Sequence, residues 1–227
     1  EKDLITGEKL LTKLWNASNF CIMNLKDFDG KKPKKFETMD LWLLNKLNVL
    51  IKNCTESFEN YEYSKVKAET ENFFWHTFCD NYLEIIKDRL YNENKRGKEA
   101  KLSAQFTLYV GLLCILKLLA PVLPFITEEI YHYYFKNREN CKSIHLTMWP
   151  IYEKSFENKQ ILNIGDKLVK LLSEVRQFKA KNKKPLTTEV TVTLESNDYR
   201  LLKDSVEDFK AATKAKEIKT GKFEVSF

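Results

Sequence analysis

The first residues of the chain show apolar positions at helical spacing. At about 100° per residue, a helix from about Asp3 to Leu25 has one largely apolar face. That face carries Leu10, Leu11, Leu14, Ser18, Cys21, Ile22 and Leu25. The opposite face is rich in lysine and amide side chains but also holds Phe20. An aromatic ring on a polar face indicates either packing against a neighbouring segment or a surface that binds something.

Four more segments of the first 150 residues have helical periodicity. Between about Asp40 and Cys54 the helix has a leucine stripe, with Asp40 as its predicted N-cap. A long helix runs from about Tyr63 to Tyr91, and a short one covers residues 126–135 after a break at two prolines. The segment from about Ala100 to Leu119 is apolar over most of its surface, which predicts a helix at the centre of a bundle.

The pattern changes near residue 150. Residues 158–182 predict another amphipathic helix, and residues 189–194 alternate between apolar and polar side chains as a strand does. We expect a short helix from about Tyr199 to Ala211 and a terminal hairpin around Gly221.

These elements predict a mainly α fold. A helical bundle in residues 1–150 is followed by a small α+β subdomain in residues 151–227, made of a helix, a strand, a helix and a hairpin. The composition agrees, because 43% hydrophobic and 31% charged residues with only 6 Gly and 5 Pro favour a globular helical protein.

The charge and the apolar content restrict the environment and the partners. A net charge of +6 is compatible with an anionic partner such as nucleic acid, although on charge alone an ordinary solvated surface is the favoured interpretation. The most apolar run, residues 110–125, contains a lysine and two prolines and is too short for a membrane span. Five scattered cysteines predict buried free thiols. We therefore expect a soluble cytoplasmic chain without a membrane partner.

Motifs for catalysis are missing from the sequence. It contains neither a phosphate-binding loop nor a dinucleotide fingerprint, and no His, Cys and Asp set has metal-ligand spacing. His76 lies in the most aromatic part of its helix, so we expect it to be partly buried and hydrogen-bonded. Cys79 and His76 do not predict a nucleophile pair. No catalytic residue, metal or cofactor is therefore assigned to this chain.

The polar face of the first helix is the main candidate site. Lysines can contact phosphates, amides can donate to and accept from base edges, and an aromatic ring can stack on an unpaired base. The candidates are Lys9, Lys13, Asn16, Asn19, Phe20 and Met23. In the alternative, Phe20 and Met23 pack under the loop that follows or against a neighbouring helix.

A second basic stretch, "VRQFKAKNKKP", ends the helix predicted at residues 158–182. Cations are favoured at a helix C-terminus in any case, so this stretch alone is ambiguous. Its possible nucleic-acid backbone contacts are Arg176, Lys179, Lys181 and Lys183.

Several segments match one family in their order along the chain. They are "KLWNASNF", "DLWLLNKLNVLI", "FFWHTFCDNYLEIIKDRLY", "LKLLAPVLPFITEEIYHYYF" and "SIHLTMWP". Together they resemble the anticodon-binding region of class I aminoacyl-tRNA synthetases, in the subgroup for valine, isoleucine and leucine. The first and third segments are most similar to the valine-specific members of archaeal type, and the isoleucine and leucine members are the alternatives.

The resemblance implies a C-terminal piece of a synthetase that grips the anticodon stem-loop of valine tRNA. The family's HIGH and KMSKS signatures and its editing domain are absent from this sequence. ATP and Mg²⁺ are accordingly expected in the catalytic domain of the parent chain. That domain is itself an expected partner of this region, whereas DNA is not expected as a partner. Family members often have Arg where this chain has Asn19.

A rival prediction from another class is a helical protein-interaction module. It rests on the aromatic content, with Tyr131, Tyr133 and Tyr134 close together. Salt separates the two predictions, because RNA binding weakens steeply with added salt whereas a hydrophobic interface changes little.

Overall fold

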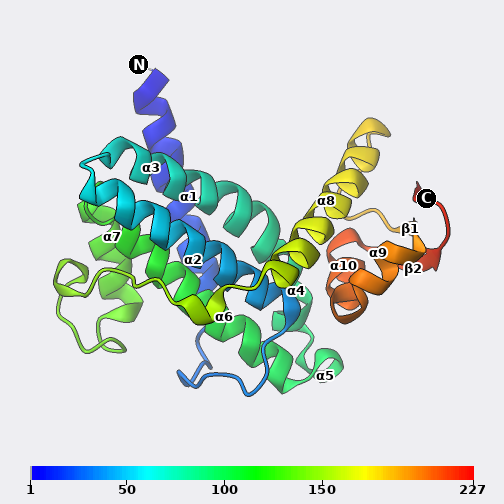
Figure 1. The fold of residues 1–227 in the computed structure, drawn as a ribbon, viewed down its shortest axis with the longest axis horizontal. Coiled ribbons are helices and arrows are strands. Elements are labelled where there is room, and N and C mark those ends of the chain that lie inside the picture. The colour runs from blue at the N-terminus through cyan, green and yellow to red at the C-terminus, as the bar shows by residue number, and fades with distance from the viewer. Residues whose placement is uncertain (1) are drawn as a thin grey trace.

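The computed structural model describes residues 2–227, with side chains from Gly7 onward, and its larger part is a helical bundle (Figure 1). One long helix is continuous through three segments, α3 (Tyr63–Asn72), the π-helix η1 (Phe73–Tyr82) and α4 (Leu83–Tyr91). The other bundle helices are α1 (Lys2–Asn24), α2 (Thr38–Glu59), α5 (Glu93–Arg96), α6 (Lys98–Leu119) and α7 (Pro124–Ile130), which continues as the π-helix η2 (Tyr131–Phe135).

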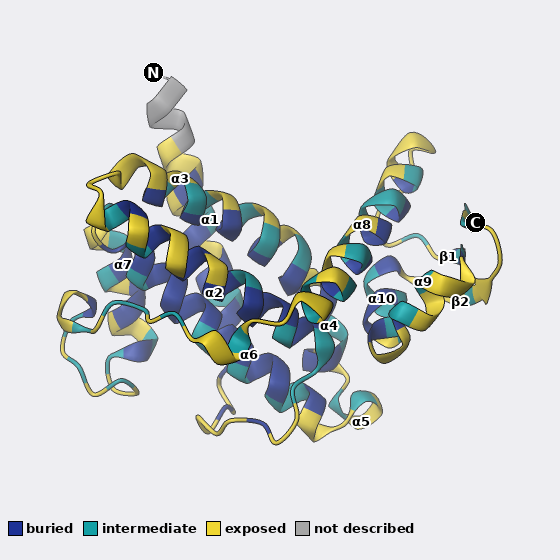
Figure 2. Ribbon diagram, in the orientation of Figure 1, coloured by how far each residue is buried: buried dark blue, intermediate teal, exposed yellow. Residues whose placement is uncertain are grey.

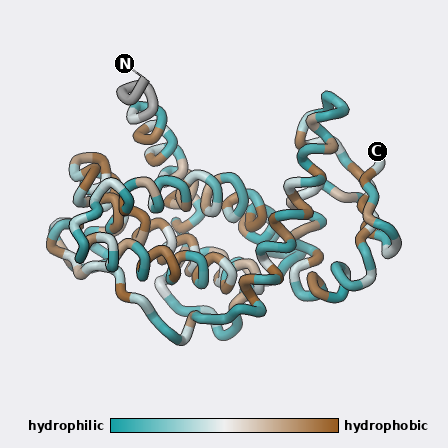
Figure 3. Tube along the Cα trace, turned by 45° about the horizontal axis from the view of Figure 1, so that its top comes forward, coloured by the Kyte–Doolittle hydropathy of each residue, from teal (hydrophilic) through white to brown (hydrophobic). Residues whose placement is uncertain are grey.

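Helix α6 lies at the centre of this bundle, as its composition predicted. It contacts α1, α2, α3 and α4. By length and composition α6 could cross a membrane, but 72% of its most apolar window is buried inside the structure, as in the core helix of a globular protein. Hydrophobic stretches alternate with hydrophilic ones along the chain (Figure 3), and the buried apolar residues of α1, α2, α3 and α4 form one core cluster with those of α6.

Two details of the predicted bundle are wrong. Helix α2 begins at Thr38, and Asp40 is fully buried instead of capping the helix, because it pairs with a buried arginine. Leu11 is 39% exposed, since it lies at the edge of the apolar face of α1. The other residues predicted on that face, from Leu10 to Leu25, are buried.

The remaining residues form a small α+β appendage. Its elements are α8 (Lys159–Lys181), β1 (Val190–Leu194), α9 (Ser196–Leu201), α10 (Val206–Thr213), β2 (Ala215–Thr220) and β3 (Glu224–Ser226). The predicted helix from Tyr199 to Ala211 is in fact two helices, because the chain turns through a 3₁₀ segment at Lys203–Ser205.

The appendage sheet has the order β2-β1-β3. Strand β1 pairs in parallel with β2 and antiparallel with β3. The predicted terminal hairpin is therefore wrong, because β2 and β3 lie on opposite sides of β1. The alternating residues Val190, Val192 and Leu194 of the central strand are buried as predicted.

The appendage packs directly on the bundle, α8 against α2 and α10 against α4. At the first contact Gly165 lies against the ring of Trp42, and Trp42 Nε1 donates to Asp166 Oδ1 at 2.9 Å. Lys46 Nζ donates to the other oxygen of that carboxylate at 2.9 Å. Buried apolar residues continue from the bundle into the appendage (Figure 2), so both parts share one core.

A buried charge network forms the second contact. Arg89 on α4 binds both oxygens of Asp40, at 2.6 and 2.9 Å, and its Nε lies 3.2 Å from Asp208 on α10. Asp208 also binds Arg96 at 2.6 Å, and Asp40 accepts from Tyr82 at 2.7 Å. Burial disfavours the charged form of Arg89, but the two carboxylates hold the pKa of Arg89 above its usual value. The network thus joins α2, α4 and α10 electrostatically.

Candidate functional site

Two hollows lie side by side along the polar face of α1. The Trp75 hollow, of about 440 Å³, is lined by Glu8, Lys9, Thr12, Lys13, Asn16 and Trp75. The Phe20 hollow, of about 200 Å³, is lined by Lys13, Asn16, Ala17, Phe20, Cys79, Leu83, Glu84 and Lys87. Lys13 and Asn16 line both hollows. Four of the six residues predicted on this face therefore border hollows large enough to receive planar groups.

Aromatic rings in both hollows lie close to ammonium groups. Lys13 Nζ is 5.1 Å from the centroid of the Trp75 ring, and Lys87 Nζ is 5.9 Å from that of Phe20. Phe20 is half-buried and packs on the core as well. The two interpretations of Phe20 are thus compatible, because the ring packs on one side and borders a hollow on the other.

Asn19 and Met23 differ from the other candidates in their position. Asn19 is half-buried and Met23 is 65% exposed, and neither lines the two hollows. Their spacing on the helix places them to one side of Asn16 and Phe20. They remain predicted contacts, at the edge of the site.

The C-terminal basic stretch is not one surface strip. Lys181 and Lys183 are exposed at the free end of α8, which projects away from the bundle (Figure 2). Lys179 was predicted to contact a nucleic-acid backbone, and this is wrong. It is 1% exposed, and its Nζ donates to the carbonyl oxygens of Leu186 and Thr213 at 2.8 and 2.7 Å. Lys179 therefore ties α8 to the loop that follows it and to the end of α10.

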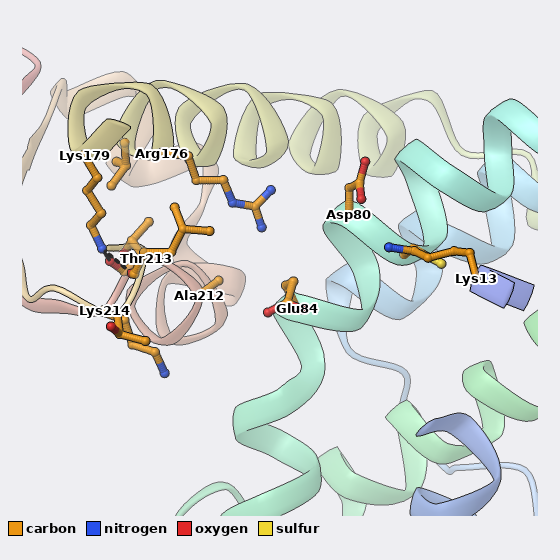
Figure 4. A pocket seen from close by; sticks show the side chains of 12 residues that line it. Lys13, Asp80, Glu84, Arg176, Lys179, Ala212, Thr213 and Lys214 are labelled. Atoms are coloured by element: carbon orange, nitrogen blue, oxygen red, sulfur yellow. Dashed lines mark hydrogen bonds between the residues drawn. The ribbon is translucent and has the colours of Figure 1, made fainter. Parts of the chain in front are cut away.

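Arg176 lies at a third hollow, which we call the bundle–appendage cleft (Figure 4). This cleft of about 460 Å³ is lined by Lys13, Cys79, Asp80, Glu84, Val175, Arg176, Lys179, Leu186, Thr187, Ala212, Thr213 and Lys214. Arg176 Nη1 donates to Asn81 Oδ1 at 3.1 Å, across from α8 to the bundle. Burial lowers the pKa of Arg176, against the opposing pull of Glu84 and Asp80.

The residues near His76 do not form a catalytic pair. The Nδ1 of His76 is hydrogen-bonded to Asp80 Oδ2 at 3.2 Å, as predicted, but the side chain is 69% exposed, so the prediction that it is partly buried is wrong. The π-helical turns here bond residue i to i+5, which shifts the face on which each side chain lies. Burial raises the pKa of Cys79 to about 12, so its thiol stays protonated at neutral pH.

Trp75, Glu84, Lys87 and Lys214 line the site but were not predicted. Trp75 and Glu84 belong to the long helix packed beside α1, and Lys214 follows α10 in the appendage. Periodicity within one helix shows which side chains are exposed, but it does not show which exposed side chains of two helices meet. The aromatic "FFWHTF" was the only local signal for Trp75.

Comparisons with a family model and with individual proteins both point to tRNA ligases. Residues 40–194 match a family model described as the anticodon-binding domain of tRNA ligase. A valine–tRNA ligase of Pyrococcus furiosus is 38% identical over 199 residues, which cover 86% of this chain and 22% of the relative. One from Ehrlichia ruminantium is 39% identical over 215 residues, 93% of this chain and 26% of the relative. One from Wolbachia is 40% identical over 184 residues, 80% of this chain and 21% of the relative. The chain thus spans about a quarter or less of the length of these relatives.

Proposed function

Because the chain belongs to the family of anticodon-binding domains of tRNA ligases, we propose that it binds the anticodon stem-loop of a tRNA within a larger valine–tRNA ligase. The parent enzyme attaches valine to its tRNA, using ATP and Mg²⁺ in a catalytic domain outside these residues. Relatives named for valine at 38–40% identity favour valine over the isoleucine and leucine alternatives.

The observation that carries the RNA-binding role is the pair of hollows along α1. Unpaired loop bases are recognised by stacking on aromatic rings and by hydrogen bonds to their edges. Phe20 and Trp75 offer rings, Asn16 offers an amide between them, and Lys9 and Lys13 offer cations for phosphates. We assign base reading to Asn16 and Phe20, with Asn19 and Met23 as peripheral contacts.

The protein-interaction alternative loses its main support. Tyr131 is fully buried, and Tyr134 is half-buried with its hydroxyl donating to the carbonyl oxygen of Leu25 at 2.9 Å. Of the three neighbouring tyrosines only Tyr133, which is 67% exposed, offers its ring to a partner. A single exposed ring does not make a hydrophobic docking patch.

Substituting Asn16→Ala and Phe20→Ala should each weaken binding of valine tRNA. Loss of a stacked base should cost about tenfold or more in affinity for Phe20→Ala, and loss of the amide about fivefold or more for Asn16→Ala. Equilibrium binding of labelled tRNA to the wild-type chain and to each variant measures both.

Matched controls are Phe106→Ala, a half-buried phenylalanine packed on the core from α6, and Asn53→Ala, an exposed amide on α2. Both controls should bind tRNA as the wild type does. Unchanged affinity in both the Asn16 and the Phe20 variants would rule out this face as the anticodon-binding surface.

The basic stretch should separate into a structural and an RNA-binding part. We expect Lys181→Ala with Lys183→Asn to leave the melting temperature unchanged and to lower the slope of log affinity against log salt by about one to two. Lys179→Met should instead lower the free energy of unfolding by about 1–3 kcal/mol, because the buried carbonyl group of Thr213 and the partly buried one of Leu186 lose their donor. Thermal melts and salt titrations measure the two effects, and an equal change of salt slope in all variants would contradict the assignment.

A further inference from the structure

The bundle–appendage cleft has walls of opposite charge (Figure 4). On the appendage side it is lined by Arg176 and Lys214, with the buried ammonium of Lys179 beneath them. On the bundle side it is lined by Asp80 and Glu84, one helical turn apart, and Lys13 lies at the end that the cleft shares with the Phe20 hollow. The acidic wall would repel a simple anion, and the basic wall would repel a simple cation. The cleft therefore suits a ligand with an anionic end and a hydrogen-bond-donating end.

The acidic wall has free acceptor capacity. Glu84 is 46% exposed, and Lys87 Nζ occupies its Oε1 at 2.6 Å. Within residues 7–227, Glu84 Oε2 receives no hydrogen bond. A carboxylate oxygen accepts but cannot donate, so it selects groups that carry N–H, such as the exocyclic amine of a nucleobase.

The cleft continues into the Phe20 hollow. Lys13, Cys79 and Glu84 line both spaces, so an RNA strand seated on Phe20 reaches the cleft without leaving the surface. With about 460 Å³, the cleft has the size of a small-ligand site. This continuity favours a nucleotide over other ligands with one anionic and one donating end.

We propose that the bundle–appendage cleft receives one unpaired nucleotide of the bound RNA. Its phosphate lies against Arg176 and Lys214, and a base bearing an exocyclic amine donates to Glu84. The inference rests on the proposed function, because this nucleotide belongs to the same anticodon loop. The appendage is then a second wall of the RNA site, and it contributes to the choice of base as well as to affinity.

Removing the Glu84 carboxylate tests the proposal, because the expected change in RNA affinity is opposite to the usual effect of removing a negative charge. Eliminating a negative charge near a polyanion normally strengthens RNA binding or leaves it unchanged. We expect Glu84→Ala to weaken binding of the valine-tRNA anticodon stem-loop by about five- to tenfold, because the base amine loses its acceptor. The matched control is Glu62→Ala, since Glu62 is 51% exposed and also pairs with a lysine three residues on, away from the cleft. It should bind no more weakly than the wild type.

Altered RNAs identify the base. Each amino-bearing loop base is replaced in turn by its counterpart without that group: 2-pyrimidinone for cytosine, purine for adenine, hypoxanthine for guanine. One such RNA should bind the wild type about five- to tenfold more weakly and lose no further affinity with Glu84→Ala. Lys214→Asn should lower the salt slope by about 0.7 for every one of these RNAs, whereas Lys222→Asn, on the turn between β2 and β3, should not.

Stem-loop titrations of these protein and RNA pairs decide the matter. If Phe20→Ala weakens binding but Glu84→Ala does not, or if no RNA substitution cancels the Glu84 effect, the cleft assignment is wrong and the α1 site stands. If the wild type does not bind the stem-loop, or if Asn16→Ala and Phe20→Ala are both neutral, the proposed function fails and the cleft assignment with it.

Discussion

Replacing Gly165 by alanine should separate α8 from α2 and, after the gain in helix propensity is subtracted, lower the melting temperature by about 4–8 °C. A Cβ atom at this position would lie 2.1 Å from Trp42 Cδ1, 2.2 Å from its Cγ and 2.8 Å from its Cβ. These atoms are the base of a buried side chain, which cannot turn aside as the end of a flexible chain can. Overpacking of this kind costs about 3 kcal/mol, and each kcal/mol lowers the midpoint by about 2–4 °C in a chain of this size.

The gain in helix propensity does not offset this cost. Alanine is favoured over glycine inside a helix by about 1 kcal/mol, which by itself would stabilise α8. Trp42 cannot move freely, because it is 2% exposed and its Nε1 is bonded to Asp166 on the same helix as Gly165. The clash therefore acts on the contact between the appendage and the bundle, and we expect weaker RNA binding through the displaced Arg176.

Two other glycines provide graded controls. Among the atoms that the structure describes, a Cβ at Gly7 meets none within 4 Å, so Gly7→Ala should leave the melting temperature unchanged or raise it slightly. A Cβ at Gly111 comes within 3.2 Å of Phe78 Cε2, which should give an intermediate loss. In a Trp42→Ala background, Gly165→Ala should cost much less than in the wild type. Equal melting temperatures for the Gly7 and Gly165 variants would contradict this account of the contact.

The sequence predicted most of the apolar residues that the bundle helices bury. The stripe of α2, the aromatic series of the long helix and the apolar α6 are all found in the core, because burial follows from the local spacing of apolar residues. The order of the strands was not predictable in this way. Strands β2 and β3 are neighbours along the chain, which favours a hairpin, whereas in the sheet each of them pairs with β1 instead.

The candidate site was predicted only in part, because local patterns describe single helices and do not show which elements meet in space. The polar face of α1 was visible in one helix, whereas the cleft needs Glu84 on α4 and Lys214 after α10 to meet across space. Lys179 shows that the burial of a charged residue cannot be predicted from the local sequence pattern. By composition it is one lysine among several, and only the nearby carbonyl oxygens of Leu186 and Thr213 make its burial favourable.

Substituting Arg89→Met should lower the free energy of unfolding by about 3–5 kcal/mol, through charges left without a partner. Asp40 and Arg89 are fully buried, and the guanidinium serves two carboxylates at once. Methionine fills similar space but leaves Asp40 with two hydroxyl donors only, from Tyr82 and Ser103. Urea denaturation followed by circular dichroism measures the loss.

A second substitution distinguishes unpaired charge from lost packing. In the Arg89→Met background, Asp208→Asn removes one of the two negative charges, so the double variant should be more stable than the sum of the single effects predicts. Arg96 still keeps Asp88 at 2.8 Å in that variant. An additive result would mean that the cost of Arg89→Met is steric, and the network would then be no electrostatic link between the appendage and the bundle.

An exposed ion pair provides the comparison for Arg89. Lys65 and Glu62 lie 3.1 Å apart with side chains 55% and 51% exposed, and water screens such a pair. Lys65→Met should therefore leave the urea midpoint unchanged, although it also removes one partner of a pair. The contrast follows from burial alone, because the carboxylate that loses Arg89 cannot be solvated whereas the one that loses Lys65 can. If both variants lose the same stability, desolvation is not the source of the Arg89 effect.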